Sequence, residues 1–428
     1  MSQPVIGFAG MTHLGVNSAA GALERGFTVV AFDPDAAVIQ GLRQGQIPVT
    51  EPGLKEILLG KKEKIAYSER PADLGACSVV YVSTDVATDD EGRSDLSAVK
   101  SLVEKSLLGM KKDAILVILC QVPPGFTRTV KLAPERLYYQ VETLVFGRAV
   151  ERAVNPERFI VGCADPLAPL PAAYREFLSA FGCPILPMRY ESAELAKIAI
   201  NCCLVASVSV ANTLAELCER IGAAWPEIAP ALKLDKRIGA HAYLSPGLGI
   251  AGGNLERDLA TVIRLAGEAG TDAGVVKAWV ANSRHRRDWA ARTIRKLLLD
   301  KNPSALVGVW GLAYKENTHS TKNSPSLATI AQMPQAALQL HDPVVPASAV
   351  RHAKARAAAE PLDAARNADA LMILTPWPQY RSVDPAEVAA AMRGRIVIDP
   401  YGVMDASKAN AAGLTVHTLG QPPLFPNA

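Results

Sequence analysis

Short apolar runs alternate with amphipathic stretches through the first 190 residues of the chain. A run of a few apolar residues bounded by Gly, Pro or Asp indicates a buried strand, whereas apolar positions three or four residues apart indicate a helix. The pattern opens with a strand at residues 4–9, a helix from about Leu14 to Arg25, and a strand at residues 28–32 that ends at Asp33. Further strands in this part are expected at residues 78–83, 114–119 and 184–186. Such alternation predicts a doubly wound parallel sheet.

The pattern changes near Tyr190. Residues 191–221 contain neither Gly nor Pro and predict one helix, roughly 45 Å long at 1.5 Å per residue. A helix of this length is expected to connect two domains and to pack against a partner. Residues 255–299 also have a helical pattern.

The alternation of strands and helices returns after residue 300. Strands are expected at residues 305–310, 337–340, 370–374 and 395–398, with a helix starting at residues 326–331. The chain is therefore predicted to be an α/β protein with two Rossmann-like domains of doubly wound parallel sheet. They span residues 1–190 and 301–428, and residues 191–300 form a helical middle region that begins with the long helix.

Composition adds little beyond this class. Charged residues make up 20%, hydrophobic residues 49%, and the net charge is +3, so nothing favours binding to nucleic acid. No uninterrupted apolar run is as long as a membrane span, and the first ten residues have no basic stretch of the kind that precedes an export signal. We therefore expect no membrane binding and a cytoplasmic location.

Cysteine and histidine do not form metal-binding patterns. The chain has seven cysteines without a C-x-x-C pair, and seven histidines without a paired spacing typical of ligands. We expect free thiols, mostly buried, and no metal site.

A glycine-rich turn follows the first strand. Gly7, Gly10 and Gly15 lie in GFAGMTHLG, about three residues longer than the usual G-x-G-x-x-G, in which glycine lets the backbone approach a pyrophosphate. Asp33 ends the second strand, 18 residues after Gly15. A carboxylate there accepts hydrogen bonds from an adenosine ribose and repels a 2′-phosphate, which favours NAD over NADP.

Six motifs in order resemble those of the UDP-glucose/GDP-mannose dehydrogenase family. They are GQIPVTEPGL (45–54), VPPGFT (122–127), NPERF (155–159), ELAK with Asn201 (194–201), RIG with SPGLG (237–249), and GLAYK with SPS (311–326). Each motif is short, but six in the same order identify the chain as a member of this family along nearly its whole length. The resemblance implies that residues 1–190 bind NAD, that residues 191–300 form a homodimer through the central helix, and that residues 301–428 bind a nucleotide sugar, most simply a UDP-sugar.

The family's chemistry is a double oxidation of a sugar primary alcohol by NAD. A cysteine thiolate adds to the intermediate aldehyde, so that a thiohemiacetal loses the second hydride before hydrolysis gives an acid. The resemblance places Lys197 at the oxygen that gains negative charge, with Asn201 one helical turn further on. It also implies that Glu157 and Asp258 position or activate water.

The same resemblance assigns the other contacts. The expected cofactor-binding residues are Gly7, Gly10, Thr12, His13, Leu14, Gly15, Asp33, Thr84 and Lys322. The expected substrate-binding residues are Glu157, Arg158, Lys197, Asn201, Arg237, Tyr243, Ser245, Gly249 and Lys315. In this arrangement Lys315 reaches the substrate from the C-terminal domain, and Arg237 reaches it across the dimer interface.

The chain departs from the family at the catalytic cysteine. The family loop P-G-x-G-Y-G-G-S-C-F-P-K-D aligns without a gap to PGLGIAGGNLERD at residues 246–258, which puts Asn254 at the cysteine. An amide does not attack an aldehyde, so the thiohemiacetal route is closed at this position. Cys202 and Cys203 are expected to point away from the Lys197 face of their helix, and Cys120 remains a possible substitute, although a buried thiol is the simpler reading.

Other departures lie close to the same motifs. They are Gln121 in place of threonine, Ser83 and Asp85 in place of prolines flanking Thr84, Arg257 in place of lysine, Lys322 near the position of an arginine, and Tyr401 in place of arginine. The candidate catalytic residues are therefore Lys197, Asn201, Glu157, Asp258, Asn254 and Gln121.

Four functions are compatible with these residues. The first is a two-electron oxidation of a nucleotide-linked alcohol to an aldehyde or ketone. The second is a transient oxidation with bound NAD that ends in epimerisation or elimination. The third is a four-electron oxidation through an aldehyde hydrate, and the fourth is a non-catalytic nucleotide-sugar binder, against which the retained lysine and acids argue.

Overall fold

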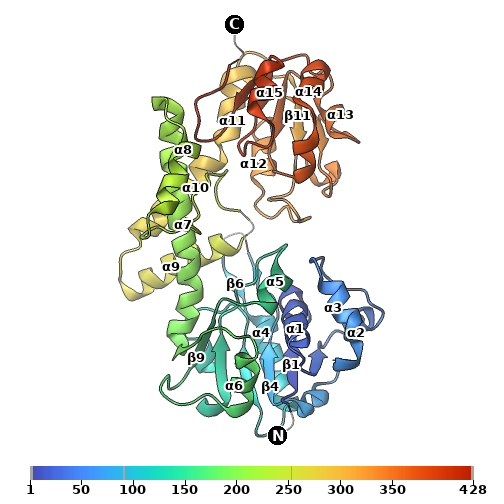
Figure 1. Cartoon of the computed structure of the whole chain (residues 1–428), viewed down its shortest axis with the longest axis vertical. Coiled ribbons are helices and arrows are strands. Elements are labelled where there is room, and N and C mark those ends of the chain that lie inside the picture. The colour runs from blue at the N-terminus through green and yellow to red at the C-terminus, as the bar shows by residue number, and fades with distance from the viewer. Residues whose placement is uncertain (1–2, 90–91, 252, 426–428) are drawn as a thin grey trace. The chain divides into compact units, whose positions relative to one another are not determined.

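The computed structural model describes residues 3–89, 92–251 and 253–425 (Figure 1). The chain forms two compact units, Met1–Ile200 and Asn201–Ala428, and the boundary falls inside the long helix α7 (Tyr190–Ile221). Each unit contains its own sheet, parallel apart from one pair of strands in the first unit, so the predicted α/β class with two Rossmann-like sheets is confirmed.

The first unit contains an eight-stranded sheet in the order β10-β9-β8-β7-β4-β1-β2-β3, in which every neighbouring pair is parallel except β8 with β9. Its strands are β1 (Ile6–Ala9), β2 (Val29–Phe32), β3 (Ile65–Ser68), β4 (Val79–Val82), β7 (Ile115–Ile118), β8 (Leu137–Gln140), β9 (Phe159–Cys163) and β10 (Ile185–Arg189). A small hairpin pairs β5 (Ala87–Thr88) with β6 (Ser94–Asp95). Its helices are α1 (His13–Glu24), α2 (Ala36–Arg43), α3 (Leu54–Gly60), α4 (Ser97–Gly109), α5 (Ala149–Val154), α6 (Ala172–Ser179) and the first part of α7.

Alternate residues of the central strands enter two different cores. Phe8 of β1 packs in one core with residues of α1, and Ala9 packs in the other with residues of α4. The central strands are buried on both faces, which explains why they read as uninterrupted apolar runs rather than as an alternating pattern.

The second unit begins with helices and continues into a six-stranded parallel sheet in the order β13-β12-β11-β14-β15-β16. Its helices are the remainder of α7, α8 (Trp225–Leu234), α9 (Asn254–Ala269), α10 (Gly274–Arg287), α11 (Trp289–Ile294), α12 (Pro325–Ala331), α13 (Pro361–Ala365), α14 (Pro385–Ala391) and α15 (Ala406–Ala411). Its strands are β11 (Leu306–Trp310), β12 (Ala337–His341), β13 (Ala355–Ala357), β14 (Ala370–Ile373), β15 (Ile396–Ile398) and β16 (Thr415–His417).

Helix α7 begins one residue before the predicted start and ends at the predicted residue. By length and composition α7 could cross a membrane, because the mean hydropathy of its most apolar window is 1.8. The sequence pattern did not predict a helix with this property. Two of its buried polar side chains are nevertheless bonded to backbone groups: Glu194 accepts hydrogen bonds from two N–H groups, and Asn212 accepts one from Gly247 N. These contacts are typical of a helix in a protein interior.

Candidate functional site

The first sheet has a topological switch point between β1 and β4. The chain moves from β1 through β2 to β3 on one side and then returns to place β4 on the other, so the carboxyl ends of β1 and β4 border a crevice. Ligands of doubly wound sheets bind at such crevices. Gly10 follows β1 and Thr84 follows β4 at this edge, and a Cβ on Gly10 would lie 3.0 Å from Thr84 Cβ.

The glycine turn has the ordinary length, contrary to the sequence-based interpretation. Gly7 lies inside β1, where a Cβ would meet Cys77 Sγ at 3.0 Å, so it is a packing residue and not part of the turn. The turn runs from Gly10, with φ of +100°, to Gly15, where a Cβ would lie 1.8 Å from the Gly10 carbonyl oxygen. Thr12 takes the middle position, and its hydroxyl accepts a hydrogen bond from Asp85 N at 2.9 Å. The turn therefore brings backbone close to the start of α1, as a pyrophosphate site requires.

Asp33 lies immediately after β2, at the same edge of the sheet. It is buried, and its carboxylate accepts hydrogen bonds from Met11 N at 2.8 Å and Asp35 N at 2.9 Å. These bonds fix the carboxylate beside the glycine turn. This is the position from which the sequence predicted a contact between Asp33 and an adenosine ribose. The cradle at Gly10, Gly15 and Asp33 fits NAD.

His13 is the first residue of α1, and its side chain is buried against other protein side chains. Its Nε2 lies 2.8 Å from Glu51 Oε1, and its ring stacks on Phe146 with centroids 4.1 Å apart. Glu51 also accepts hydrogen bonds from Gly147 N and Ala149 N. The glutamate of the E-P-G-L motif therefore joins the start of α1 to the segment before α5. Leu14, also expected at the cofactor, is buried in the α1 core.

The second sheet repeats this construction. Gly311 follows β11 with φ of +96°, and a Cβ there would lie 2.4 Å from Thr375 Cβ, which follows β14. Asp342 follows β12 and accepts hydrogen bonds from Leu312 N at 2.6 Å and Ala313 N at 3.1 Å. The expected substrate residue Lys315 comes just after this turn, with its Nζ 5.7 Å from the Tyr314 ring centroid.

The carboxylate beside Lys197 is Glu142, not Glu157. Lys197 Nζ lies 3.3 Å from Glu142 Oε2, and the two side chains are 12% and 18% exposed. Glu142 comes two residues after the buried strand β8. Neighbouring Glu194, which belongs to the same E-L-x-K motif, is fully buried and accepts hydrogen bonds from Gly125 N and Thr127 N. Burial raises the pKa of Glu194, and its bonds attach α7 to the V-P-P-G-F-T turn.

Glu157 lies on the surface with two arginines. Its side chain is 61% exposed and pairs with Arg152 at 3.2 Å and Arg158 at 2.8 Å. The hydrogen bond from Arg152 lowers the pKa of Glu157 below its usual 4.5. The Nε of Arg152 donates to the Thr143 carbonyl at 2.6 Å, so this cluster supports the segment that carries Glu142. N-P-E-R precedes β9, which runs antiparallel to β8 and so begins at the sheet edge where Glu142 lies, but the Glu157 side chain pairs with arginines and not with Lys197.

Asn201 and Asp258 form a buried pair. Asn201 Nδ2 donates to Asp258 Oδ2 at 2.5 Å, and Arg257 Nε lies 3.4 Å from Asp258 Oδ1. All three residues are buried. The sequence assigned Asn201 and Asp258 to separate roles, and the structure brings the two side chains into contact.

Asn254 is the first residue of α9 and is exposed. Gly253 precedes it in the left-handed region, with φ of +93°. A Cβ on Gly253 would lie 3.6 Å from Lys322 Cγ, and Asn323 Nδ2 donates to Glu256 Oε2 at 2.6 Å. The loop that carries Lys322 therefore packs against the start of α9, where helical N–H groups have no intrahelical partner.

The glycine loop before α9 is held by three elements. Gly247 N donates to Asn212 on α7, Ile250 N donates to Ser283 on α10, and Tyr401 is hydrogen-bonded to the Leu248 backbone. Gly249 has φ of +77°, and a Cβ there would lie 2.4 Å from the Ser283 carbonyl oxygen, so only glycine fits. Three other expected substrate residues precede or begin this loop and are exposed: Arg237, Tyr243 and Ser245. Arg237 pairs with Asp235 at 2.6 Å.

None of the seven cysteines forms a disulfide. Cys120 is fully buried, its thiol donates to the Val82 carbonyl, and burial raises its pKa to about 12. Burial also raises the pKa of Cys202 to about 11. The thiolate is the nucleophilic form, so neither cysteine replaces the family's nucleophile. Gln121 follows Cys120 and is partly buried.

Two contacts of the expected site residues were missed from the sequence, that of Glu142 with Lys197 and that of Glu51 with His13. The signal for Glu142 was its place two residues after β8, whose sequence LYYQ ends in polar side chains and does not form an apolar run. In the described ranges 3–89, 92–251 and 253–425, no group of three His, Cys, Asp or Glu side chains is arranged to hold a metal ion.

Comparisons with known proteins agree with this geometry along the chain. Residues 5–177 match the NAD binding domain of the UDP-glucose/GDP-mannose dehydrogenase family, residues 191–284 its central domain, and residues 308–406 its UDP binding domain. The chain is 28% identical to UDP-glucose 6-dehydrogenase TuaD of Bacillus subtilis, covering 97% of this chain and 93% of that protein. It is also 28% identical to a UDP-glucose 6-dehydrogenase of Pseudomonas aeruginosa, covering 96% of each.

A solved structure shows the same architecture. The UDP-glucose dehydrogenase of the archaeon Pyrobaculum islandicum superposes with a TM-score of 0.84 at 26% identity, covering 95% of this chain and 96% of that one. The chain therefore belongs to the UDP-glucose/GDP-mannose dehydrogenase family, and it is an NAD-dependent oxidoreductase of the nucleotide-sugar dehydrogenase type.

Proposed function

We propose that this protein oxidises one alcohol of a UDP-linked sugar by two electrons and releases the carbonyl product. The observation that carries the proposal is Asn254 at the start of α9, where the family resemblance places the nucleophilic cysteine. NAD accepts the hydride from the alcohol carbon, and the hydroxyl proton leaves to a base, which gives an aldehyde or ketone, NADH and a proton. The second oxidation of the family needs a thiohemiacetal, which an amide does not form.

Lys197 and Glu142 are the pair that we assign to the alcohol. Glu142 accepts the hydroxyl proton, directly or through one water, and Lys197 stabilises the negative charge that develops on the oxygen. Their low exposure supports this assignment, since a charge pair shielded from water interacts more strongly with a developing charge than an exposed pair does.

Asn201 and Asp258 have a supporting role in the proposal. Asp258 accepts the amide hydrogen of Asn201 and so orients the Asn201 carbonyl oxygen, which then accepts from a sugar hydroxyl. Arg257, buried against the same carboxylate, balances the charge of Asp258. The cluster therefore holds the Asn201 amide in one orientation.

We infer a UDP-sugar because both named relatives are UDP-glucose 6-dehydrogenases and because residues 308–406 match the family's UDP binding domain. Lys315, just after the Gly311 turn, is assigned to the diphosphate or sugar, and Arg158, Tyr243, Ser245 and Gly249 to the remaining contacts. Thr84 and Lys322 are assigned to NAD, with Gln121 close to its reacting end. We place the reaction in the cytoplasm, where NAD and nucleotide sugars are both available.

The test is identification of the product. Purified protein is incubated with NAD and a panel of UDP-sugars, hydroxylamine is added to trap any carbonyl, and products are identified by mass spectrometry. The proposal expects the oxime of a carbonyl compound that has two hydrogens fewer than the alcohol, and no uronic acid. If uronic acid is the main product, the two-electron proposal is wrong and the reaction is a four-electron oxidation through an aldehyde hydrate. If the sugar is altered without net formation of NADH, the protein is instead an epimerase.

We also propose a homodimer formed through α7. Val210, Leu214, Leu217 and Ile221 are 40% to 64% exposed and recur every three or four residues, which makes an apolar stripe along this helix. A second copy of the helix buries such a stripe, and Arg237 would then contact the partner's substrate. Light scattering after chromatography is expected to give twice the chain mass, and Leu217→Glu is expected to give the chain mass.

A further inference from the structure

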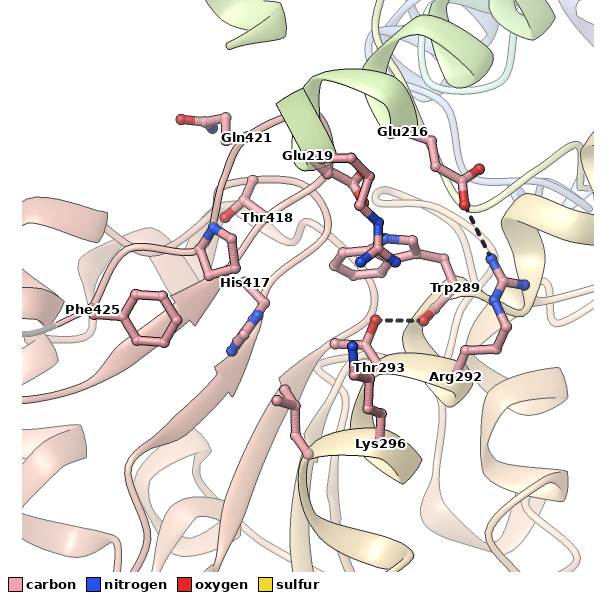
Figure 2. Close-up of a pocket in the computed structure, with 13 residues that line it drawn as sticks. Glu216, Glu219, Trp289, Arg292, Thr293, Lys296, His417, Thr418, Gln421 and Phe425 are labelled. Atoms are coloured by element: carbon pink, nitrogen blue, oxygen red, sulfur yellow. Dashed lines mark hydrogen bonds and ion pairs between the residues drawn. The ribbon is translucent and has the colours of Figure 1, made fainter. Parts of the chain in front are cut away.

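A cavity of about 450 Å³ lies in the second unit, formed by three segments that are distant in sequence (Figure 2). Glu216 and Glu219 enter it from α7, Arg292 and Lys296 from α11 and the helical turn after it, and His417 and Phe425 from the C-terminal segment (Figure 2). Its size is in the range of small-molecule sites, which hold roughly 300–1,000 Å³. None of the residues assigned to catalysis or to NAD lines it.

The two acids of the cavity are already neutralised. Glu216 lies within 3.0 Å of His285 and Arg286 and 3.7 Å from Arg292. Glu219 pairs with the fully buried Arg286 and accepts hydrogen bonds from Trp289 Nε1 and Gly420 N. These carboxylates therefore hold the walls together and offer little attraction to a further cation.

The remaining charge of the cavity is positive. Arg220 and Lys296 both line it and are exposed. Across the residues that the structure describes, neither has a carboxylate within 4.0 Å, in contrast to most arginines of the chain. Guanidinium and ammonium groups at the edge of a cavity bind phosphate or carboxylate oxygens well.

The rest of the lining is flat and apolar. Trp289 is buried in one wall, and Phe425 is 65% exposed at the other. The ring of His417 meets the Phe425 ring edge-on, with centroids 6.5 Å apart, and Leu297 and Pro423 complete the apolar surface. Aromatic walls of this kind bind planar rings. An occupant that satisfies the whole lining therefore carries both a planar ring and an anionic group.

We propose that this cavity binds a nucleoside phosphate, with the base against Trp289 and Phe425 and the phosphate between Arg220 and Lys296. The site is separate from the residues assigned to NAD and to the nucleotide sugar. Its occupant contacts α7, α11 and the C-terminal segment, three elements that Glu219 also connects through Trp289 and Gly420. Binding is therefore expected to stabilise the fold.

The test is calorimetric titration of protein that carries NADH and one equivalent of UDP per chain, so that the cofactor and substrate sites are filled and the cavity is left open. UMP and AMP are titrated separately, with uridine, adenosine and inorganic phosphate as comparison probes. We expect one further equivalent of UMP or AMP per chain, bound at least about tenfold more tightly than phosphate or the nucleoside, because each part of the ligand adds a contact.

Lys296→Glu is expected to weaken this further binding by about tenfold or more and to leave NADH and UDP binding unchanged. Lys301→Glu is the matched control, since it makes the same charge change at an exposed position outside the cavity. The proposal is overturned if no further equivalent binds, if phosphate alone binds as tightly, or if both variants behave alike. Failure of NADH or UDP to bind at all would instead count against the proposed function.

Discussion

Replacing Glu142 by Gln removes the carboxylate from Lys197 while keeping the size of the side chain. The Lys197 Nζ and Glu142 Oε2 atoms lie 3.3 Å apart in a site where both side chains are less than a fifth exposed, so the amide leaves Lys197 without its anionic partner. A positioned general base contributes about 10²–10⁴-fold to rate, which is roughly 2.7–5.4 kcal/mol of transition-state stabilisation. We expect kcat to fall by that factor, with a smaller change in KM.

Glu157→Gln makes the same chemical change at the position where the sequence first suggested the catalytic acid. Glu157 is 61% exposed, and exposed ion pairs are worth about 0–1 kcal/mol, so kcat should change less than about fivefold. NADH absorbance gives kcat and KM for both variants, and thermal melting shows whether each is folded. If Glu157→Gln loses as much activity as Glu142→Gln, or more, the assignment of Glu142 is refuted.

Three further changes test other parts of the site. Asn254→Cys restores a thiol at the start of α9, and we expect uronic acid and a second NADH per sugar, measured by mass spectrometry and absorbance; the absence of acid would show that position 254 is not the nucleophile position. Asp33→Asn removes the charge that repels a 2′-phosphate, so the ratio of kcat/KM for NADP to that for NAD should rise about tenfold or more; an unchanged ratio would count against Asp33 as the ribose contact. His417 is buried and its pKa lies below the usual 6.5 because of that burial, so the unfolded chain binds more protons and stability should fall as pH drops below about 6.5. His417→Gln should make the fall in Tm between pH 7.5 and 5.5 shallower, and an identical slope would contradict this.

The fold could be predicted well from the sequence because its strongest signals are local. The central strands are buried on both faces and so appear as short apolar runs, and α7 appears as 31 residues without Gly or Pro. Asp33 and Gly15 could be placed for a similar reason, since each directly follows or precedes such an element. The edge strands β3 and β10 are partly exposed and gave weaker signals.

The candidate site was predicted only where its residues lie on one recognisable element. Lys197 and Asn201 share α7, so their spacing was sufficient to group them. Glu142 and Lys197 are 55 positions apart and meet only because β8 and α7 pack in one core, which periodicity does not reveal. Gly7 misled the interpretation because glycine in a strand and glycine in a turn look the same in sequence, and only contact with Cys77 distinguishes them. The cavity between α7, α11 and the C-terminal segment was not predicted at all, for the same long-range reason.

The central claim is that Asn254 limits the reaction to one oxidation, and the amount of NADH formed per sugar consumed tests it most directly. A limiting amount of UDP-sugar is converted to completion with excess NAD, and hydroxylamine traps the carbonyl product. NADH is measured by absorbance, and the remaining UDP-sugar is measured by chromatography. The account predicts one NADH per sugar for the native protein. Two NADH per sugar would contradict it, because the second oxidation would then proceed without a thiol at position 254.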